Sequence, residues 1–351
     1  MPAIMPLGLQ PGTVLLNKYE VIRILGSGYF GEVYHVRNRS LGHEAALKIV
    51  QITDPVSHRA HIEAQAQHLC NHDHVVKIYT ADILNGAVLI EMEYIDGGSL
   101  GDRLSREFVP VVDSITCVKQ ILFALEHAHN RDIIHRDVKP ANIMLAGANA
   151  KLSDFGTIIQ PSTGVSVTNL FYQAHASPEA FNNQAFSSRS DVFGAGMTLL
   201  RAANNIPDIG RFLSGPGSRQ HIANGTLPHA IGYEAYLPSR LKRVLKRALH
   251  PNPDERYPDA RTFRQELERL SPERRWVRQA DRTWICTCAN GREERIVYLG
   301  GGRHRVERTI GGRRRQPDCR DFRNEAEARK YMDGLVANTT LATAAASTRQ
   351  R

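Results

Sequence analysis

The chain has 351 residues, five cysteines and a formal net charge of +9 at pH 7. It is too long for one typical domain, and so few cysteines do not form a disulfide framework in a chain of this size. No run of about eighteen apolar residues is present, and residues 1–12 lack the basic flank and apolar core of a signal peptide. These features predict a cytoplasmic protein with reduced thiols and no membrane partner.

The basic charge is concentrated at the C-terminal end. Residues 273–351 contain 18 of the 45 Lys and Arg residues but only 10 of the 36 Asp and Glu residues. They therefore carry a net charge of +8, against +1 for residues 1–272. This difference predicts one large unit of balanced charge followed by a smaller basic unit.

A glycine-rich segment follows the first predicted strand, which covers residues 19–25. The segment reads Gly26-Ser27-Gly28-Tyr29-Phe30-Gly31. A G-x-G-x-x-G pattern alone could indicate a dinucleotide site, but that site needs a helix to begin at the glycines. Residues 33–37 instead predict a second strand, so the glycines form a hairpin whose backbone can close over phosphate groups.

Two charged residues stand out in the next segments. Residues 45–50 predict a third strand that contains Lys48. Such a lysine more often faces solvent at a sheet edge, but its spacing from the glycines favours a phosphate-binding role. Residues 58–70 predict a helix that contains Glu63. Residues 88–100 predict a further strand, which could be an ordinary interface strand, although the Gly97-Gly98 pair favours a flexible hinge after it.

The C-terminal half of the large unit is predicted to be mostly helical. Residues 113–130 form a long helix whose apolar stripe consists of Ile121, Leu122, Leu125 and Ala128. We expect this stripe to be core, and we interpret His127 and His129 beside it as helix-end residues rather than metal ligands. Further helices are predicted over residues 239–249 and 260–270.

The most specific pattern is His135-Arg136-Asp137-Val138-Lys139-Pro140-Ala141-Asn142, followed by Asp154-Phe155-Gly156. Phosphoryl transfer spreads negative charge over oxygens, so its catalysis depends on positioning and on neutralisation by metal and cations. Asn142 and Asp154 offer the oxygen ligands that Mg²⁺ takes. Asp137 suits the acceptor of a substrate hydroxyl proton, and Lys139 suits a clamp on the transferred phosphate.

With these motifs the chain resembles the eukaryotic-like (Hanks-type) serine/threonine protein kinase family, and a bacterial member is favoured. The family pattern H-R-D-L-x-x-x-N followed by D-F-G is matched except at Val138. The resemblance covers residues 19–270, preceded by an extension over residues 1–18. It implies an α+β, bilobal protein-kinase-like fold with an antiparallel sheet and one helix in the N-lobe and a mostly helical C-lobe.

The resemblance also implies an activity and its cofactors. The chain would transfer the γ-phosphate of ATP, held with Mg²⁺ or Mn²⁺, to a serine or threonine hydroxyl of a protein substrate of unknown identity. It would also phosphorylate itself.

Roles of individual residues follow from the same resemblance. The catalytic residues would be Asp137, Lys139, Lys48 and Glu63, and the metal ligands would be Asn142 and Asp154. The ATP-binding residues would be Gly26, Ser27, Gly28, Tyr29, Phe30, Gly31, Val33, Ala46, Lys48, Met92, Glu93 and Ile95. Glu179 would pair with Arg256, and Asp191 would anchor the catalytic loop from below.

Two residues depart from the family pattern. Gln67 stands where an apolar residue usually links the lobes, and Tyr172 stands where a threonine usually contacts the catalytic Asp and Lys. Arg136 is of the kind that pairs with a phosphorylated activation loop. The candidate phosphorylation sites are Ser162, Thr163, Ser166 and Thr168. The departures leave open a nucleotide-binding pseudokinase scaffold, or a kinase for a non-protein hydroxyl.

Residues 273–337 predict a small basic α+β module of unknown role. Residues 283–287, 294–299 and 303–310 predict three strands separated by glycine-containing turns. A helix from residue 325 to about residue 336 would have Asn324 as its N-cap and Glu327 closing a capping box. Residues 338–351 are expected to form a disordered tail.

Two ligand classes are conceivable for this module. Its arginines, which include Arg303, Arg305, Arg308, Arg313, Arg314 and Arg315, could bind nucleic acid or an acidic protein, or could equally form a solvated face. Zinc is not expected, because Cys286, Cys288, His304 and Cys319 lack the paired spacing of a zinc site.

Overall fold

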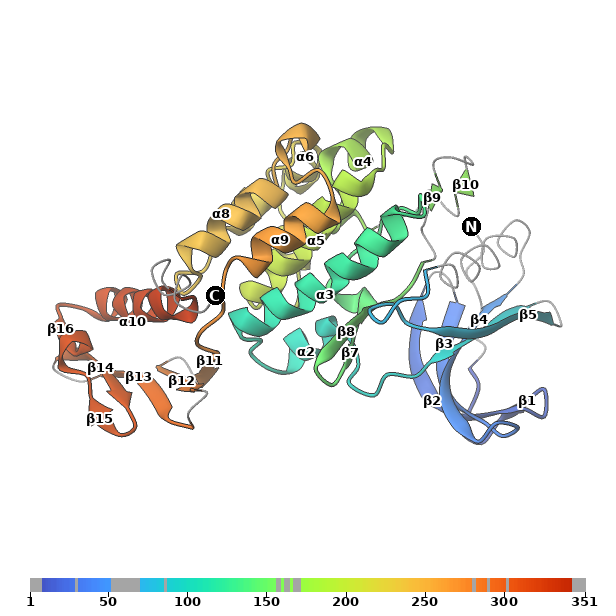
Figure 1. The fold of residues 1–351 in the computed structure, drawn as a ribbon, viewed down its shortest axis with the longest axis horizontal. Coiled ribbons are helices and arrows are strands. Elements are labelled where there is room, and N and C mark those ends of the chain that lie inside the picture. Colours follow the sequence, from blue (N-terminus) through green and yellow to red (C-terminus); the bar gives the residue numbers. More distant parts are fainter. Residues whose placement is uncertain are drawn as a thin grey trace.

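The computed structural model describes residues 8–28, 31–51, 70–84, 87–155, 159–160, 165–166, 172–279, 282–288, 291–300 and 303–342. The chain forms an N-lobe, a C-lobe and a C-terminal module, which follow one another along the longest axis of the molecule (Figure 1). The predicted bilobal α+β architecture is confirmed. Within the described ranges, no helix is long and apolar enough to cross a membrane.

The N-lobe is a six-stranded sheet in the order β1-β2-β3-β4-β6-β5, with antiparallel pairing throughout. Its strands are β1 (Val14–Leu15), β2 (Tyr19–Gly28), β3 (Gly31–Asn38), β4 (His43–Gln51), β5 (Ile78–Leu84) and β6 (Ala87–Glu93). β2 and β3 form the predicted hairpin, in which Gly28 pairs with Gly31. β1 belongs to this sheet although it lies in the range we assigned to an N-terminal extension.

The two faces of the N-lobe sheet carry different residues. One face holds a buried apolar cluster that includes Tyr34 and Leu47, with Leu9 packed on it from the N-terminal segment. The opposite face carries the residues predicted to bind ATP, because strand register pairs Val33 with Lys48 and Ala46 with Met92. Alternation of side chains along each strand therefore separates the core face from the candidate nucleotide face.

The C-lobe is mostly helical. Its helices are α2 (Leu100–Arg106), α3 (Val111–His129), α4 (Pro178–Asn183), α5 (Ser188–Ala203), α6 (Ser218–Ala223), α7 (Leu227–Ile231), α8 (Ser239–Ala248) and α9 (Ala260–Glu268). The predicted stripe of α3 is fully buried and packs with α5 and α9. The short strands of this lobe are β7 (Ile143–Ala146), β8 (Asn149–Leu152), β9 (Ile159–Gln160) and β10 (Val165–Ser166).

The C-terminal module contains a larger sheet than predicted. Its strands are β11 (Trp276–Gln279), β12 (Thr283–Thr287), β13 (Glu293–Leu299), β14 (His304–Ile310), β15 (Arg313–Arg314) and β16 (Arg320–Phe322). The three predicted strands correspond to β12, β13 and β14, and the sheet has six. β15 and β16 are only two and three residues long, too short for an alternating pattern to be visible in the sequence.

The C-terminal helix is also longer than predicted. α10 (Glu325–Thr340) continues past residue 336, so a disordered tail from residue 338 is wrong for residues 338–342. The Thr340 carbonyl accepts hydrogen bonds from the backbone of Glu273 and Arg274, and Leu341 pairs with Pro272. These tertiary contacts stabilise the C-terminal end of α10, which the local sequence alone does not predict to be helical. Residues 343–351 lie outside the described residues.

The start of α10 matches the prediction only in part. Asn324 is the N-cap, and its side chain accepts from the Glu327 backbone N–H at 2.9 Å. The Glu327 carboxylate accepts from the Asn324 side-chain amide rather than from its backbone, so the capping box is incomplete.

Several arginines of the module form ion pairs within it. Arg308 is 3% exposed and donates to Glu294 at 2.6 Å and to Asp318 at 3.0 Å. Arg305, Arg314 and Arg315 also form ion pairs with carboxylates of the module. Four of the six arginines named for a nucleic-acid or acidic protein partner are therefore engaged within the module, which weakens that prediction.

The thiols of the module show no metal-binding arrangement. Cys286 is buried, and the Cys288 thiol donates to Glu294 Oε1 at 3.3 Å. Over the part of the chain that the structure describes, no group of three His, Cys, Asp or Glu side chains could hold a metal ion.

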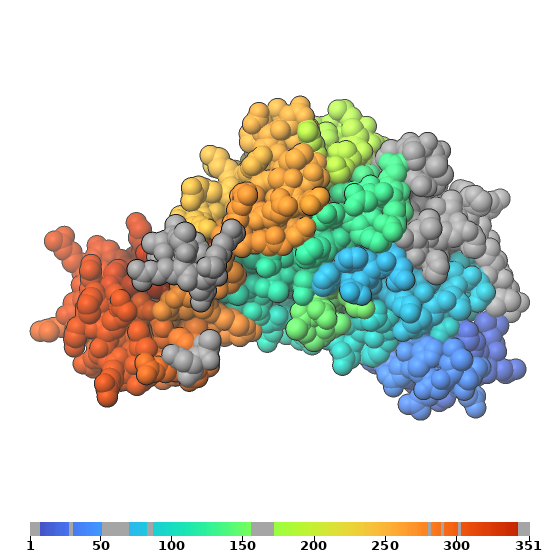
Figure 2. All heavy atoms as spheres, viewed as in Figure 1, coloured from blue at the N-terminus to red at the C-terminus, as the bar shows by residue number. Residues whose placement is uncertain are grey.

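The module packs directly on the base of the C-lobe. Trp284 is 1% exposed and contacts the rings of Phe108 and Tyr236, at centroid distances of 5.3 and 5.0 Å. Arg275 forms a two-point ion pair with Asp113 of α3, with both N–O distances 2.8 Å. The space-filling view shows the module as one end of the molecule, opposite the N-lobe (Figure 2).

Candidate active site

The catalytic loop lies between α3 and β7 and contains a compact polar cluster. Lys139 Nζ donates to Asp137 Oδ2 at 2.6 Å. The Asn142 side-chain amide, at the end of a 3₁₀ turn (Pro140–Asn142), donates to the same carboxylate at 3.0 Å and to the Asp137 carbonyl at 2.9 Å. Asp137 and Asn142 are both buried. Lys139 and Asn142 therefore both bind the Asp137 carboxylate, as their spacing in the sequence predicts.

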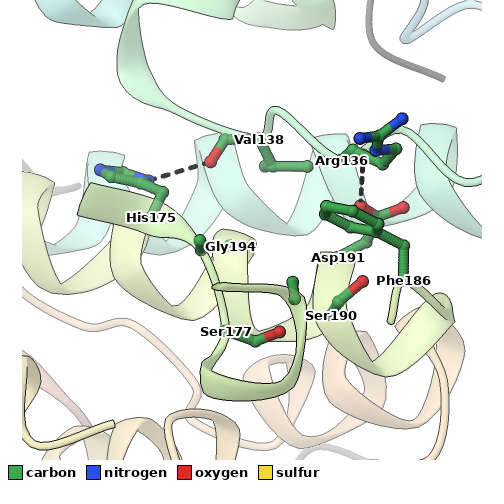
Figure 3. Close-up of a pocket in the computed structure, with 10 residues that line it drawn as sticks. Arg136, Val138, His175, Ser177, Phe186, Ser190, Asp191 and Gly194 are labelled. Atoms are coloured by element: carbon green, nitrogen blue, oxygen red, sulfur yellow. Dashed lines mark hydrogen bonds between the residues drawn. The ribbon is translucent and has the colours of Figure 1, made fainter. Parts of the chain in front are cut away.

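Asp191 of α5 holds the start of this loop (Figure 3). Its carboxylate accepts from the backbone N–H groups of His135 and Arg136, both at 2.8 Å, and lies 2.8 Å from His129 Nε2. Arg136 has a positive φ of 71°, a conformation that a non-glycine residue adopts only when other contacts stabilise it. Burial alone would raise the pKa of Asp191, but the hydrogen bond from His129 and its positive charge lower that pKa.

The β7–β8 hairpin delivers Asp154 to the same place. The Ser153 backbone N–H donates to the Asn142 carbonyl at 2.9 Å, just before Asp154. Lys48 Nζ of β4 donates to Asp154 Oδ1 at 3.2 Å, so the candidate nucleotide face of the N-lobe faces the catalytic loop. Burial would raise the pKa of Asp154, but the charges of Lys48 and Lys139 lower it below its ordinary value.

Phe155 anchors the residue that follows Asp154. Its ring is fully buried and makes an edge-to-face contact with His135, with centroids 4.8 Å apart. Burial also lowers the pKa of His135. The buried Phe155 ring thus anchors the backbone next to Asp154.

Two glycines, one in the N-lobe sheet and one in the predicted hinge, lie where another backbone segment leaves no room for a side chain. Gly31 has φ +115°, and a Cβ there would lie 2.2 Å from the Ile49 carbonyl oxygen. A Cβ at Gly97 would lie 2.0 Å from the Leu145 carbonyl oxygen, so the predicted hinge is packed tightly against β7. Glu93, one of the residues expected to bind ATP, ties the hinge to β8 through its carboxylate, which accepts from Lys151 Nζ at 2.7 Å.

A buried ion pair supports the region beyond the catalytic loop. Arg256 donates to both oxygens of Glu179, at 2.7 and 2.9 Å, and its side chain is fully buried. The Arg256 guanidinium also donates to the carbonyls of His250 and Pro251. This arrangement contains the expected pair and satisfies the donors of a buried arginine.

Some predicted residues cannot be placed. Tyr29, Phe30, Glu63, Gln67, Gly156, Ser162, Thr163 and Thr168 lie outside the described residues, and only the backbone of Ser166 is described, within β10. Arg136, expected to meet a phosphorylated loop, is buried with its guanidinium 4.0 Å from the centroid of the Phe186 ring. Burial lowers the pKa of Arg136 to about 10.

Sequence reasoning missed contacts that link the catalytic loop to distant segments. His175 Nδ1 lies 2.9 Å from the Val138 carbonyl oxygen (Figure 3). Arg201 donates to His175 Nε2 at 3.1 Å. Lys139 Nζ lies 5.0 Å from the centroid of the Tyr172 ring. No local pattern signals these contacts, because each joins residues more than twenty positions apart.

Comparison with known proteins supports the family resemblance that this fold and this cluster of residues carry. Residues 19–267 match the family model described as "Protein kinase domain". Because the match covers more than half of the chain, the chain belongs to the protein kinase family, and its relatives place it with the eukaryotic-like serine/threonine type.

Three relatives illustrate the likeness. Serine/threonine-protein kinase PknB of Mycobacterium leprae is 33% identical, over 73% of this chain and 43% of that protein. Serine/threonine-protein kinase PknJ of Mycobacterium tuberculosis is 29% identical, over 73% of this chain and 45% of that protein. CBL-interacting serine/threonine-protein kinase 20 of Arabidopsis thaliana is 28% identical, over 70% of this chain and 57% of that protein. The chain spans about half the length of the curated relatives that it matches.

Proposed function

We propose that this protein transfers the γ-phosphate of ATP to serine or threonine hydroxyl groups of protein substrates, itself included. The observation that carries the proposal is the convergence of two charge pairs from separate elements. Lys48 reaches Asp154 at 3.2 Å, and Lys139 reaches Asp137 at 2.6 Å, with Asn142 bonded to the second carboxylate. Cations and oxygen ligands thus flank the position that a transferred phosphate needs.

The residues divide the reaction between them. Asp137 would orient the acceptor hydroxyl and take its proton, while Lys139 would neutralise the phosphate as it moves. Lys48 would hold the nucleotide phosphates, against the face formed by Val33, Ala46 and Met92. Asn142 and Asp154 would hold Mg²⁺, which supplies charge neutralisation at the phosphate oxygens when it is bound.

The proposed setting is the cytoplasm, with a protein substrate whose identity is unknown. The pairs Lys48–Asp154 and Lys139–Asp137 support this function over a pseudokinase scaffold, because phosphoryl transfer needs both acidic residues and both lysines. Among the described residues of the C-terminal module, no contact favours nucleic acid as a partner.

The test is transfer of labelled phosphate from ATP with Mg²⁺, in the wild type and in Asp137→Ala. We expect phosphoserine or phosphothreonine on the chain itself, and a loss of about 10²- to 10⁴-fold in rate in the variant. Asp254→Ala is the matched control, because the exposed Asp254 carboxylate pairs with Arg189 and not with a residue of the catalytic loop, so it should leave the rate unchanged. ATP binding without transfer in the wild type would favour the pseudokinase.

The activation region gives a second test of the same proposal. By the family resemblance, Arg136 would pair with a phosphate on Ser162, Thr163, Ser166 or Thr168. Replacing all four with alanine should lower the rate if the enzyme needs that phosphate. An unchanged rate would show that its activity is independent of phosphorylation at these residues.

A further inference from the structure

The Lys139 side chain lies between a carboxylate and an aromatic ring. Its ammonium nitrogen is 2.6 Å from Asp137 Oδ2 and 5.0 Å from the centroid of the Tyr172 ring. The ring face is the negative region of an aromatic side chain, so it attracts a cation at this distance. A threonine, the usual residue at this position in the family that the chain resembles, has no such face.

The segment that carries Tyr172 is fixed to the catalytic loop at its other end. A 3₁₀ turn (Gln173–His175) follows Tyr172, and His175 is buried. Because a guanidinium only donates, the bond from Arg201 makes His175 Nε2 an acceptor and places the proton on Nδ1. Nδ1 therefore donates to the Val138 carbonyl, the residue directly before Lys139 (Figure 3).

Both ends of residues 172–175 thus contact Val138-Lys139. The ring position is not a chance placement of a loose side chain, because the turn after it is hydrogen-bonded to the same loop. Tyr172 is 37% exposed and the Lys139 side chain 22%, so the pair lies at the open side of the site. A substrate approaching Asp137 would meet the ring and the ammonium together.

We propose that Tyr172 is a positioning residue that acts through Lys139. Its ring holds the ammonium beside Asp137, where the transferred phosphate passes, in place of the hydroxyl contacts that a threonine would make. The role in catalysis rests on the proposed function of Lys139, whereas the contact between ring and ammonium can be measured without any activity.

The kinetic test compares Tyr172→Phe with Tyr172→Leu. Phenylalanine keeps the ring face, so its kcat should stay within about two-fold of the wild type. Leucine removes the face, and its kcat should fall by about three- to thirty-fold, the range that a cation–π contact of this kind supplies. The KM for ATP should change by less than about two-fold, because the nucleotide face of the N-lobe is untouched. Tyr233→Leu is the matched control, since Tyr233 is also 37% exposed but lies outside the site.

A double-mutant cycle separates positioning from mere support of the fold. In a Lys139→Met background, Tyr172→Leu should have little further effect, because the ring has no ammonium to hold. Equal losses in both backgrounds would overturn the proposal, and so would a loss in Tyr172→Phe as large as that in Tyr172→Leu.

An NMR measurement tests the contact independently of activity. In protein labelled with ¹³C-lysine, the Lys139 side-chain protons should be shifted upfield by the ring current in the wild type and in Tyr172→Phe. The shift should disappear in Tyr172→Leu and persist in Tyr233→Leu, with the resonance assigned by its loss in Lys139→Arg. An inactive wild type with this shift would contradict the proposed function alone. Absence of the shift in the wild type would overturn the inference.

Discussion

His175 shows how the surroundings of one side chain fix its charge. Its imidazole is 4% exposed, and burial together with the positive charge of Arg201 lowers its pKa to about 3. A neutral ring is required by its hydrogen bonds, since Nε2 accepts from Arg201. The unfolded chain imposes no such constraint, so its histidine would titrate near the ordinary value of about 6.5.

This difference predicts a loss of stability in acid that depends on His175. The folded state excludes a proton that the unfolded state binds, so the contribution is complete above about pH 6.5 and decreases as pH falls toward about pH 3. The slope due to this group should approach about 1.4 kcal/mol per pH unit. Urea unfolding at several pH values, in the wild type and in His175→Gln, measures it. The same slope in both proteins would contradict the prediction.

At the scale of elements, the C-lobe depends on contacts between short segments that have little stability alone. α4 has six residues, and Glu179 in its first turn is held by Arg256, which follows a 3₁₀ turn (Pro253–Glu255). The two segments are 77 residues apart in the chain. Because isolated helices of this length are unstable in water, the ion pair and the surrounding core determine that α4 forms.

We expect Glu179→Ala to destabilise the fold by about 3 kcal/mol. The substitution leaves the fully buried Arg256 guanidinium without its carboxylate, which costs more than the loss of an exposed pair. Asp254→Ala is the control, because it removes an ion pair with Arg189 whose carboxylate is 78% exposed, and it should cost less than about 1 kcal/mol. Chemical denaturation measures both variants. Equal losses would show that burial does not determine the strength of these pairs.

At the scale of the whole molecule, the C-terminal module and the C-lobe share one apolar core. The cluster of buried residues runs from α3 and α5 through Tyr236 to Trp284 and Met332 of the module. Arg275 reaches Asp113 across the same junction, and Arg240 of α8 donates to the Ala342 carbonyl at 3.1 Å. The sequence division into residues 19–270 and 273–337 is therefore not accompanied by a gap in packing.

A shared core predicts that module and C-lobe unfold together. Trp284→Ala should lower the stability of the whole chain by about 3–5 kcal/mol, because it removes a buried indole between Phe108 and Tyr236. Leu299→Ala is the control, since Leu299 is 41% exposed, and it should cost less than about 1 kcal/mol. Calorimetry should show one transition involving both parts. A separate early transition of the module in the variant would indicate an independent domain.

The candidate site was predictable to a different degree at each residue. Asp137, Lys139 and Asn142 lie within six residues of one another, so local spacing alone brings them together. Lys48 and Asp154 are 106 residues apart, and their meeting was predictable only through the family resemblance. The contacts of Tyr172 and His175 were not predictable, because they involve side chains that depart from the pattern or lie outside it.

The sequence by itself determined the strands β2, β3, β4 and β6 of the N-lobe, the long α3 helix and the catalytic motifs. Alternating and helical apolar periodicities are local properties, and turn glycines mark their limits. Only the tertiary structure decided that α10 extends to Thr340, that β15 and β16 join the module sheet, and that Arg308 and Arg314 are paired with carboxylates of the module. These features depend on hydrogen bonds and charges supplied by distant segments, which no local pattern encodes.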